Sequence, residues 1–459
     1  MAGKQRKRVH WYEKKQAKKA KKDAEGEDDA AADEATKKPA DDDFDRRNHF
    51  PTVIHPGSYA AQLDPTDTSD KCGSGPKRRY GLLIAYCGRE YSGMQMNIGV
   101  KTVEAELEQA LYNAGAIARC NYGLIQKIGW NRAARTDKGV HAAGQLVCAK
   151  LCVEGTEDEF RDKVNSFLPK DIRVLEVVAV TKNFNAKNSC DRRTYEYLAP
   201  TFVFQPAAAR SSSVSNDQPW DAHANEIFTN LAVDQTAWQT QKEYRLDDAT
   251  YDKIQETLAL YEGTHNFHNF TSKLPPYSPK CNRYIMSFKA DKPFVLNGAE
   301  WIRMRVIGQS FLLHHIRKMI GTMIDVLRGA TPIATIAKAF EQTKMDLPKA
   351  PSAGLYLAKA HFDVYNDKNE NHRPSLEFDE PAQLARIEAF KRDQIFPEIM
   401  DKEEQHAIFP LWLLQLDAFP FSYATLPFDE WKVQKEAAAA RNAGRATESD
   451  DEQQGDDDE

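Results

Sequence analysis

Residues 300–329, EWIRMRVIGQSFLLHHIRKMIGTMIDVLRG, change from one hydrophobic periodicity to another within a single short stretch. In residues 300–308 the side chains alternate strictly, which is typical of a β-strand with two different faces. In residues 310–329 apolar residues recur at helical spacing. One strand face carries Ile302, Met304 and Val306, the other Trp301, Arg303 and Arg305, and the helical stripe consists of Leu312, Ile316, Met319, Met323 and Leu327. The stretch therefore predicts a strand followed by an amphipathic helix.

The same two signals recur on both sides of this stretch. Further strands are predicted at residues 80–88, 172–180 and 192–199, and after a Pro/Gly-containing loop within 350–365. Further helices are predicted at residues 103–115, with Thr102 as the N-cap, at 246–263 and at 333–342. Strands and helices alternate without the glycine fingerprint of a nucleotide-binding fold, so we expect an α+β protein with mostly antiparallel sheets.

The two ends of the chain are strongly charged. Residues 1–47 contain 14 Lys and Arg and 12 Asp and Glu, and residues 448–459 contain 8 acidic residues and no basic one. Such compositions bury too little apolar surface to fold. The basic run at the N-terminus indicates either a nuclear-import signal or an arm that touches RNA, and a solubilising tail is the alternative. The remainder is neutral overall, so binding to a polyanion would need a local basic patch.

The composition also limits compartment and class. The seven cysteines are scattered without a CxxC pair, which favours free thiols in a reducing compartment. No apolar run reaches the roughly 18 residues of a membrane span. The first residues are basic and hydrophilic, so we expect no secretory signal.

The stretch ARTDKGVHAAG, residues 134–144, concentrates reactive side chains around two glycines. Asp137 stands two residues before a glycine, which is turn chemistry, and a solvated turn is the plainest interpretation. However, Arg135 and Lys138 flank this single carboxylate, so they would keep it ionised and would attract phosphate. A predicted apolar strand follows and would attach the loop to the core. His141 lies where the chain enters that strand, and a structural role is at least as plausible as general-base chemistry.

Five sequence blocks together resemble the TruA family of tRNA pseudouridine synthases, in particular its eukaryotic nuclear, multisite branch. They are GWNRAARTDKGVHAAGQ (129–145), FNAKNSCDRRTYEY (184–197), GTHNFHNFTS (263–272), GQSFLLHHIRKMIG (308–321) and APSAGLYL (350–357). The blocks follow the family's order and span about residues 79–365. The resemblance implies that Asp137 is the catalytic carboxylate and that Arg317 pairs with it. It also implies that Tyr195 stacks on the uracil, and that Arg135 fills the gap left by the flipped-out base.

The resemblance further implies an architecture and a substrate. Two ferredoxin-like halves would join their antiparallel sheets into one central sheet, with helices on one side and an RNA-binding cleft on the other. The substrate would be tRNA, with small nuclear RNA or mRNA as further candidates, and Lys138 would help to bind it. No cofactor and no metal are implied. The expected protein is a nuclear monomer that has no membrane partner.

We divide the chain accordingly. The divisions are a disordered, charged N-terminal tail (1–78), a first catalytic half carrying Asp137 (79–204), a surface insertion (205–245), a second half (246–365), a partly helical extension (366–432) and an acidic tail (433–459). The insertion and the extension exceed the compact bacterial pattern. Arg303 and Arg305 either line bound RNA or face solvent.

Two other classes of protein remain as alternatives. A non-catalytic RNA-binding or tRNA-folding protein on the same scaffold would keep the basic groups and the tyrosine but would not need Asp137. A metal hydrolase would assemble a zinc site from dispersed ligands, although their spacings match no common zinc site. The candidate ligands are His265, His268, His314, His315 and Cys281.

Overall fold

The computed structural model describes residues 54–63, 70, 72–207, 241–272, 274–418, 427, 429–430, 432–433 and 436–437. In this part of the chain, ten strands form one sheet in the order β4-β1-β3-β10-β5-β9-β7-β6, with β2 beside β3 and β8 beside β9. The strands are β1 (Lys77–Tyr86), β2 (Asn131–Arg132), β3 (His141–Cys152), β4 (Ile172–Ala179), β5 (Arg192–Pro200), β6 (Gly263–Asn266), β7 (Asn282–Ala290), β8 (Phe294–Leu296), β9 (Ala299–Gly308) and β10 (Leu355–His361). Every pairing is antiparallel except that of β3 with β10.

The sheet consists of two halves with the same connectivity. The first half runs β1-α2-β2-β3-α3-β4 and the second β5-α6-β7-β9-α7-β10. In both, the spatial order of the four strands is fourth, first, third, second, which is the ferredoxin-like arrangement. The helices are α2 (Val103–Asn113), α3 (Glu157–Phe167), α6 (Asp248–Ala259) and α7 (His315–Leu327). A short parallel ladder, Tyr356 with His141 and Leu357 with Ala142, joins the halves. The predicted α+β class with two ferredoxin-like halves is confirmed.

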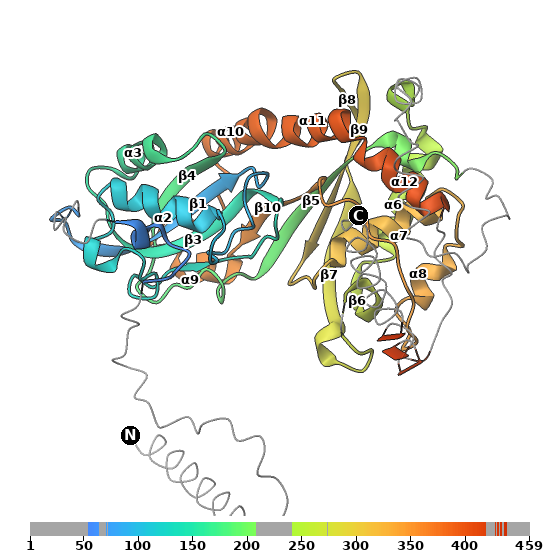
Figure 1. Ribbon diagram of the computed structural model, residues 1–459, viewed down its shortest axis with the longest axis horizontal. Coiled ribbons are helices and arrows are strands. Elements are labelled where there is room, and N and C mark those ends of the chain that lie inside the picture. The colour runs from blue at the N-terminus through green and yellow to red at the C-terminus, as the bar shows by residue number, and fades with distance from the viewer. Residues whose placement is uncertain are drawn as a thin grey trace, which may run out of the picture. The chain divides into compact units, whose positions relative to one another are not determined.

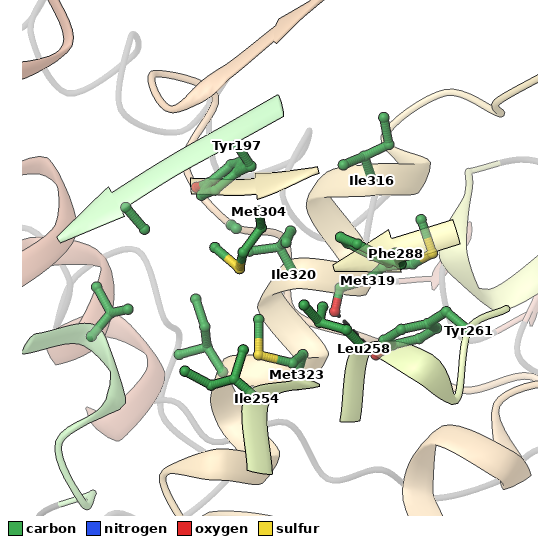
Figure 2. Packing of buried hydrophobic residues seen from close by; sticks show 14 of the residues in the cluster. Tyr197, Ile254, Leu258, Tyr261, Phe288, Met304, Ile316, Met319, Ile320 and Met323 are labelled. Atoms are coloured by element: carbon green, nitrogen blue, oxygen red, sulfur yellow. Dashed lines mark hydrogen bonds between the residues drawn. The ribbon is translucent and has the colours of Figure 1, made fainter. Parts of the chain in front are cut away.

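One face of the sheet carries two helix pairs, one on each half. The α2–α3 pair covers strands β1, β3 and β4, and Leu107 and Phe160 pack there against Leu82 and Val147. The α6–α7 pair covers β5, β7 and β9 of the second half. Figure 2 shows Met319, Ile320 and Met323 of α7 packed among sheet residues and α6, and the hydroxyl of Tyr261 donates to the carbonyl of Met319 at 3.0 Å.

The opposite face is covered by helices of the C-terminal extension, which differs from the predicted one-sided layering. They are α9 (Asp363–Asn369), α10 (Pro381–Phe390), a π-helical segment (Lys391–Ile395) and α11 (Phe396–His406). Figure 1 shows α10 and α11 running along the sheet from the β4 end toward β8 and β9. Phe390, Ile395 and Ile399 pack against apolar residues of the sheet such as Leu146 and Tyr356. Strands β1, β3 and β10 carry apolar side chains on both faces of the sheet. The helices of the extension therefore bury the second apolar face.

Most predicted elements have the type that their pattern indicated. Thr102 caps α2 by accepting from the amide of Ala105. The helix predicted from residue 310 begins only at His315, because His314 adopts the left-handed conformation with φ of 63°. Two further helices are α8 (Ala334–Lys338) and α12 (Ile408–Ala418). None of the described helices is both long and apolar enough to cross a bilayer.

Parts of the predicted tails and insertion fall outside the described residues, among them residues 1–53 and 208–240. Residues 54–63 are described, although they belong to the predicted N-terminal tail. They include a 3-10 helix, Tyr59–Gln62, and they pack against α2. The hydroxyl of Ser58 donates to Glu108 at 2.6 Å, and that of Tyr59 donates to Glu106 at 2.9 Å.

A buried cluster of charges connects the C-terminal extension to the central strand β5. Glu196, only 3% exposed, accepts from Arg305 at 3.0 Å and from Lys391 of the π-helical segment at 3.4 Å. Arg303 lies 3.9 Å from Glu196 and donates to Asp291 at 2.6 Å. The two arginines of β9 therefore compensate a buried carboxylate, while the Arg305 side chain stays 38% exposed.

Candidate active site

The loop between β2 and β3 presents Asp137 at its tip. The Asp137 side chain is exposed, as are those of Arg135 and Lys138. The amide of Val140 donates to the carbonyl of Asp137 at 3.2 Å, which closes the turn, and Gly139 between them has φ of 76°. Only glycine adopts that conformation without cost, so the glycine two residues after Asp137 lets the chain turn back into β3.

The residues before Asp137 are held by buried side chains. The amide group of Gln145 accepts from the Ala134 backbone amide at 3.1 Å and donates to the Ala134 carbonyl at 2.8 Å. The hydroxyls of Thr136 and Tyr86 are 2.7 Å apart in a hydrogen bond. Since Gln145 and Tyr86 are fully buried in the strands β3 and β1, the loop position is set by the core.

A second strand reaches the same loop from the other half. Arg193 of β5 donates to the Ala133 carbonyl from Nη2 at 2.6 Å and from Nε at 3.2 Å. Its Nη1 donates to the Gln309 carbonyl at 3.0 Å, just before α7. One guanidinium thus links the backbone before Asp137 to the segment that leads to Arg317.

His141 is a structural residue. It is fully buried, and its Nδ1 accepts from the Gly88 amide at 2.9 Å. Burial, together with the nearby Lys402 and Arg89, lowers the pKa of His141 to about 3. The imidazole is therefore neutral at pH 7. The structural interpretation of this histidine is confirmed.

Tyr195 lies on β5, on the face that carries α6 and α7, and packs against the cores of both halves. Its ring meets that of Phe311 edge to face, with the centroids 5.2 Å apart. Burial raises the pKa of Tyr195 to about 12, the nearby Arg193 lowers it, and Cys190 and Asp137 raise it. The phenol is therefore neutral at pH 7.

Arg317 lies in the first turn of α7 and is half-buried. Its Nε donates to the carbonyl of Ala350 at 2.7 Å, and the Ala350 amide donates to the Arg317 carbonyl at 3.0 Å. These two bonds fix the arginine against the loop that precedes β10. Burial lowers the pKa of this guanidinium, and Tyr197 and Asp137 raise it. An arginine remains charged under these conditions.

The charge of Asp137 reaches three groups from the second half of the molecule. It raises the pKa of Tyr195, of His314 and of Arg317, each of which burial shifts most strongly. Together with the bonds from Arg193 to the carbonyls of Ala133 and Gln309, this indicates that the Asp137 loop lies near β5 and the start of α7. The expected pairing of Arg317 with Asp137 is not found: among the described residues the two form no ion pair within 4.0 Å, because the Arg317 guanidinium donates to the Ala350 carbonyl and the Asp137 side chain is exposed.

The residues that position this loop were not predicted from the sequence. Gln145, Tyr86 and Arg193 all contact the loop or its backbone, and Phe311 packs on Tyr195. A polar Gln145 inside an otherwise apolar strand was the signal that could have revealed the first of them, because a buried amide needs partners.

Three of the four histidines of the alternative zinc site have other partners. His265 stacks on Phe340 with the ring centroids 4.2 Å apart, and Nε2 of His268 bonds the Thr343 carbonyl at 3.0 Å. His315 packs against the ring of Phe267 at 4.3 Å. In the described part of the chain, three potential ligands gather at a different place: His361, Asp363 and Glu377. There, Arg192 pairs with Asp363 and Lys359 with Glu377, so both carboxylates are already compensated.

Comparison with known proteins identifies the family of this chain. A family model described as tRNA pseudouridine synthase matches residues 258–363. The chain is 38% identical over 355 residues to the Pseudouridylate synthase 1 homolog of Mus musculus, and this similarity covers 76% of each chain. It is 38% identical over 348 residues to the Pseudouridylate synthase 1 homolog of Homo sapiens, with 75% of this chain and 74% of the relative covered. It is 34% identical over 399 residues to tRNA pseudouridine synthase 1 of Yarrowia lipolytica, with 75% of each chain covered.

The fold and the matches define an isomerase of the pseudouridine synthase class. More narrowly, the chain belongs to the TruA family of tRNA pseudouridine synthases.

Proposed function

We propose that this protein isomerises specific uridines of tRNA to pseudouridine, with Asp137 as the catalytic carboxylate. The observation that supports the proposal is the link that Arg193 makes between the Asp137 loop and the segment before α7, through the carbonyls of Ala133 and Gln309. Asp137 lies in the β2–β3 loop, Tyr195 on β5 and Arg317 in α7. The relatives named tRNA pseudouridine synthase support tRNA as the substrate.

The reaction needs few groups. The bond from uracil N1 to ribose C1′ breaks, the base turns, and a bond forms from C5 to C1′. The proton on C5 leaves and N1 gains one, so no oxidant, reductant or external nucleophile is consumed. Asp137 either attacks C1′ or promotes the loss of uracil through a glycal. Arg317, which Ala350 holds in place, supplies a positive charge on the α7 side of the site.

Tyr195 stacks on the uracil and takes part in removing the C5 proton. With a pKa of about 12 its phenol is neutral in the free protein, so the oxygen can accept that proton only while passing its own to a second base. The carboxylate of Asp137 is the nearest candidate, because its charge already acts on Tyr195. This couples the final deprotonation to the residue that began the reaction.

Arg135 and Lys138 bind the RNA. Both are exposed and lie within two residues of Asp137. Arg135 occupies the gap in the stack when the target base leaves it, and Lys138 contacts a phosphate. The substrates include several tRNA positions, with the anticodon stem-loop region among them, and extend to small nuclear RNA or mRNA. The protein acts as a monomer.

A tritium-release assay tests the activity. The substrate is a tRNA transcript labelled at uridine C5, because pseudouridine formation releases that hydrogen to water. The wild type should release tritium at defined positions, and Asp137→Ala should release none while still binding the transcript. Equal release by both proteins would refute the role of Asp137. Binding without release by the wild type, across tRNA, small nuclear RNA and mRNA transcripts, would favour the non-catalytic RNA-binding alternative.

We also propose that the protein resides in the nucleus. The basic run within residues 1–22 supports this location, because such runs are typical of import signals. A fluorescent fusion that lacks residues 1–22 should lose nuclear enrichment. Unchanged nuclear enrichment of that fusion would remove the argument.

A further inference from the structure

His314 has a left-handed backbone conformation, with φ of 63° and ψ of 5°. Few non-glycine residues adopt it, although histidine does so more often than most, as asparagine and aspartate do. Neighbouring bonds hold it there. Thr271 Oγ1 donates to the Leu313 carbonyl at 2.9 Å, and the Lys318 amide donates to the His314 carbonyl at 2.9 Å. Strain of this kind gathers at functional sites, where the surrounding structure maintains it.

The imidazole of His314 serves no structural purpose among the described residues. It is half-buried, it does not cap α7, and it makes no hydrogen bond with them. A strained backbone that directs an unpartnered side chain is unexpected in packing alone. Arg193 bonds the carbonyl of Ala133, four residues before Asp137, at 2.6 Å and that of Gln309, five residues before His314, at 3.0 Å. The segment that carries this imidazole is therefore held beside the Asp137 loop.

Positive charge surrounds this imidazole. Arg317 is one helical turn further along α7. Lys349 directly precedes Ala350, which is bonded twice to Arg317, so the lysine lies next to the guanidinium. Lys349 is exposed and has no acidic partner in the described part of the chain. Burial and the two cations lower the pKa of His314, so the ring is a neutral N–H donor at pH 7.

We propose that His314 and Lys349 form a subsite for one phosphodiester of the RNA backbone, next to the uridine held at Asp137. This inference rests on the proposed function. Any ribose presented to Asp137 carries phosphates on its 5′ and 3′ oxygens, so an anion must come close to the carboxylate. A corner with two unopposed donors, one of them a cation, favours that anion and offsets its repulsion by Asp137.

His314→Gly tests the side chain without adding backbone strain. Glycine adopts the left-handed conformation freely, so this variant should melt at the same temperature as the wild type or higher. It should nevertheless bind an unmodified tRNA transcript about tenfold more weakly, as should Lys349→Met. The matched control is Lys280→Met, an exposed lysine on another loop, which should bind as the wild type does. Unchanged affinity for both His314→Gly and Lys349→Met would overturn the proposal.

Chemical removal of a phosphate charge identifies the ligand atom. Transcripts that carry a single neutral methylphosphonate 5′ or 3′ of the target uridine should bind the wild type about tenfold more weakly at one of the two positions. The same substitution should cost Lys349→Met nothing further, because the contact is already lost. Additive losses at both positions would contradict the subsite. Binding is measured with Asp137→Asn as well, so the result stands or falls independently of catalysis.

Discussion

The side-chain amide of Gln145 brackets the backbone of Ala134, with hydrogen bonds of 3.1 and 2.8 Å to its amide and carbonyl. Gln145 is fully buried in β3, and Ala134 lies three residues before Asp137. The strand after the loop, β3, therefore also holds the residues that come just before Asp137. A loop clamped from both ends can present a carboxylate in one orientation while its tip stays exposed to RNA.

Gln145→Leu keeps the volume of the side chain and removes both hydrogen bonds. It leaves a buried amide and a buried carbonyl of Ala134 unpaired, at a cost of about 1–3 kcal/mol each. We expect kcat to fall at least tenfold, because Asp137 loses its fixed position, while tRNA affinity changes little. The exposed Gln126→Leu is the control and should alter neither. A Gln145→Leu variant with normal kcat would show that the clamp does not position the loop.

Arg317 should not tolerate replacement by lysine. Its Nε bonds the Ala350 carbonyl, so a planar guanidinium can hold this contact and still direct its terminal nitrogens toward Asp137. We expect Arg317→Lys and Arg317→Ala both to reduce kcat by about 10²–10³-fold, as for loss of a preorganised donor. Single-turnover rates at saturating enzyme measure this, and lysine retaining more than a third of the activity would contradict it.

Substitutions of Glu196 and of Lys391 in the buried charge cluster should destabilise the fold unequally. Burial alone would raise the pKa of Glu196, but Lys391, Arg303 and Arg305 and a hydrogen bond from Tyr356 lower it to about 2. Glu196→Gln leaves three cations together and should destabilise the fold by about 3–5 kcal/mol. Lys391→Met leaves the carboxylate with its arginines and should cost about 2 kcal/mol. Urea unfolding at pH 7 compares them, and the reverse order would contradict this view of the cluster.

Buried histidines make the fold sensitive to acid. Burial lowers the pKa of His141 and of His315 to about 3, with further lowering by nearby cations, against about 6.5 in an unfolded chain. Below pH 6.5 the unfolded chain therefore takes up protons that the folded protein does not bind. The free energy of unfolding should fall by about 1.4 kcal/mol per pH unit for each histidine between pH 6 and 4.

His315→Phe isolates one of these contributions, since the ring already packs against Phe267. Urea unfolding between pH 7 and 4.5 should show a shallower fall in stability for this variant than for the wild type. Identical slopes for the two proteins would mean that His315 is protonated in the folded state.

Much of this fold was predictable from local pattern. The alternation in residues 300–308 identified β9, and the helical stripe after it identified the body of α7. Its start was misplaced because the left-handed turn at His314 is imposed by tertiary bonds, among them that from Thr271, which no local propensity reports. The helices on the second face of the sheet were equally hidden, since an amphipathic pattern does not specify which face of a sheet it will cover.

The candidate site shows the same division. Asp137, Tyr195 and Arg317 were selected through a resemblance that spans five sequence blocks, and their joint role stays a prediction. Arg303 and Arg305 had the composition of an RNA-binding face, yet they pair with Glu196 and Asp291. Alternation in the sequence indicates the sheet face on which a residue lies. It does not show which charged residues lie on that face after folding. Gln145 and Arg193 act through the backbone of distant residues, which leaves no periodic signal.

The role of Asp137 is tested most directly by measuring single-turnover pseudouridine formation in tRNA that is saturated with the Asp137→Asn variant. Asparagine preserves the shape of the side chain and removes only its charge, so tRNA affinity should stay within about threefold of the wild type. We expect no detectable pseudouridine in that complex, which corresponds to a loss of at least 10⁴-fold in the rate. Conversion by Asp137→Asn at a rate within tenfold of the wild type would contradict it.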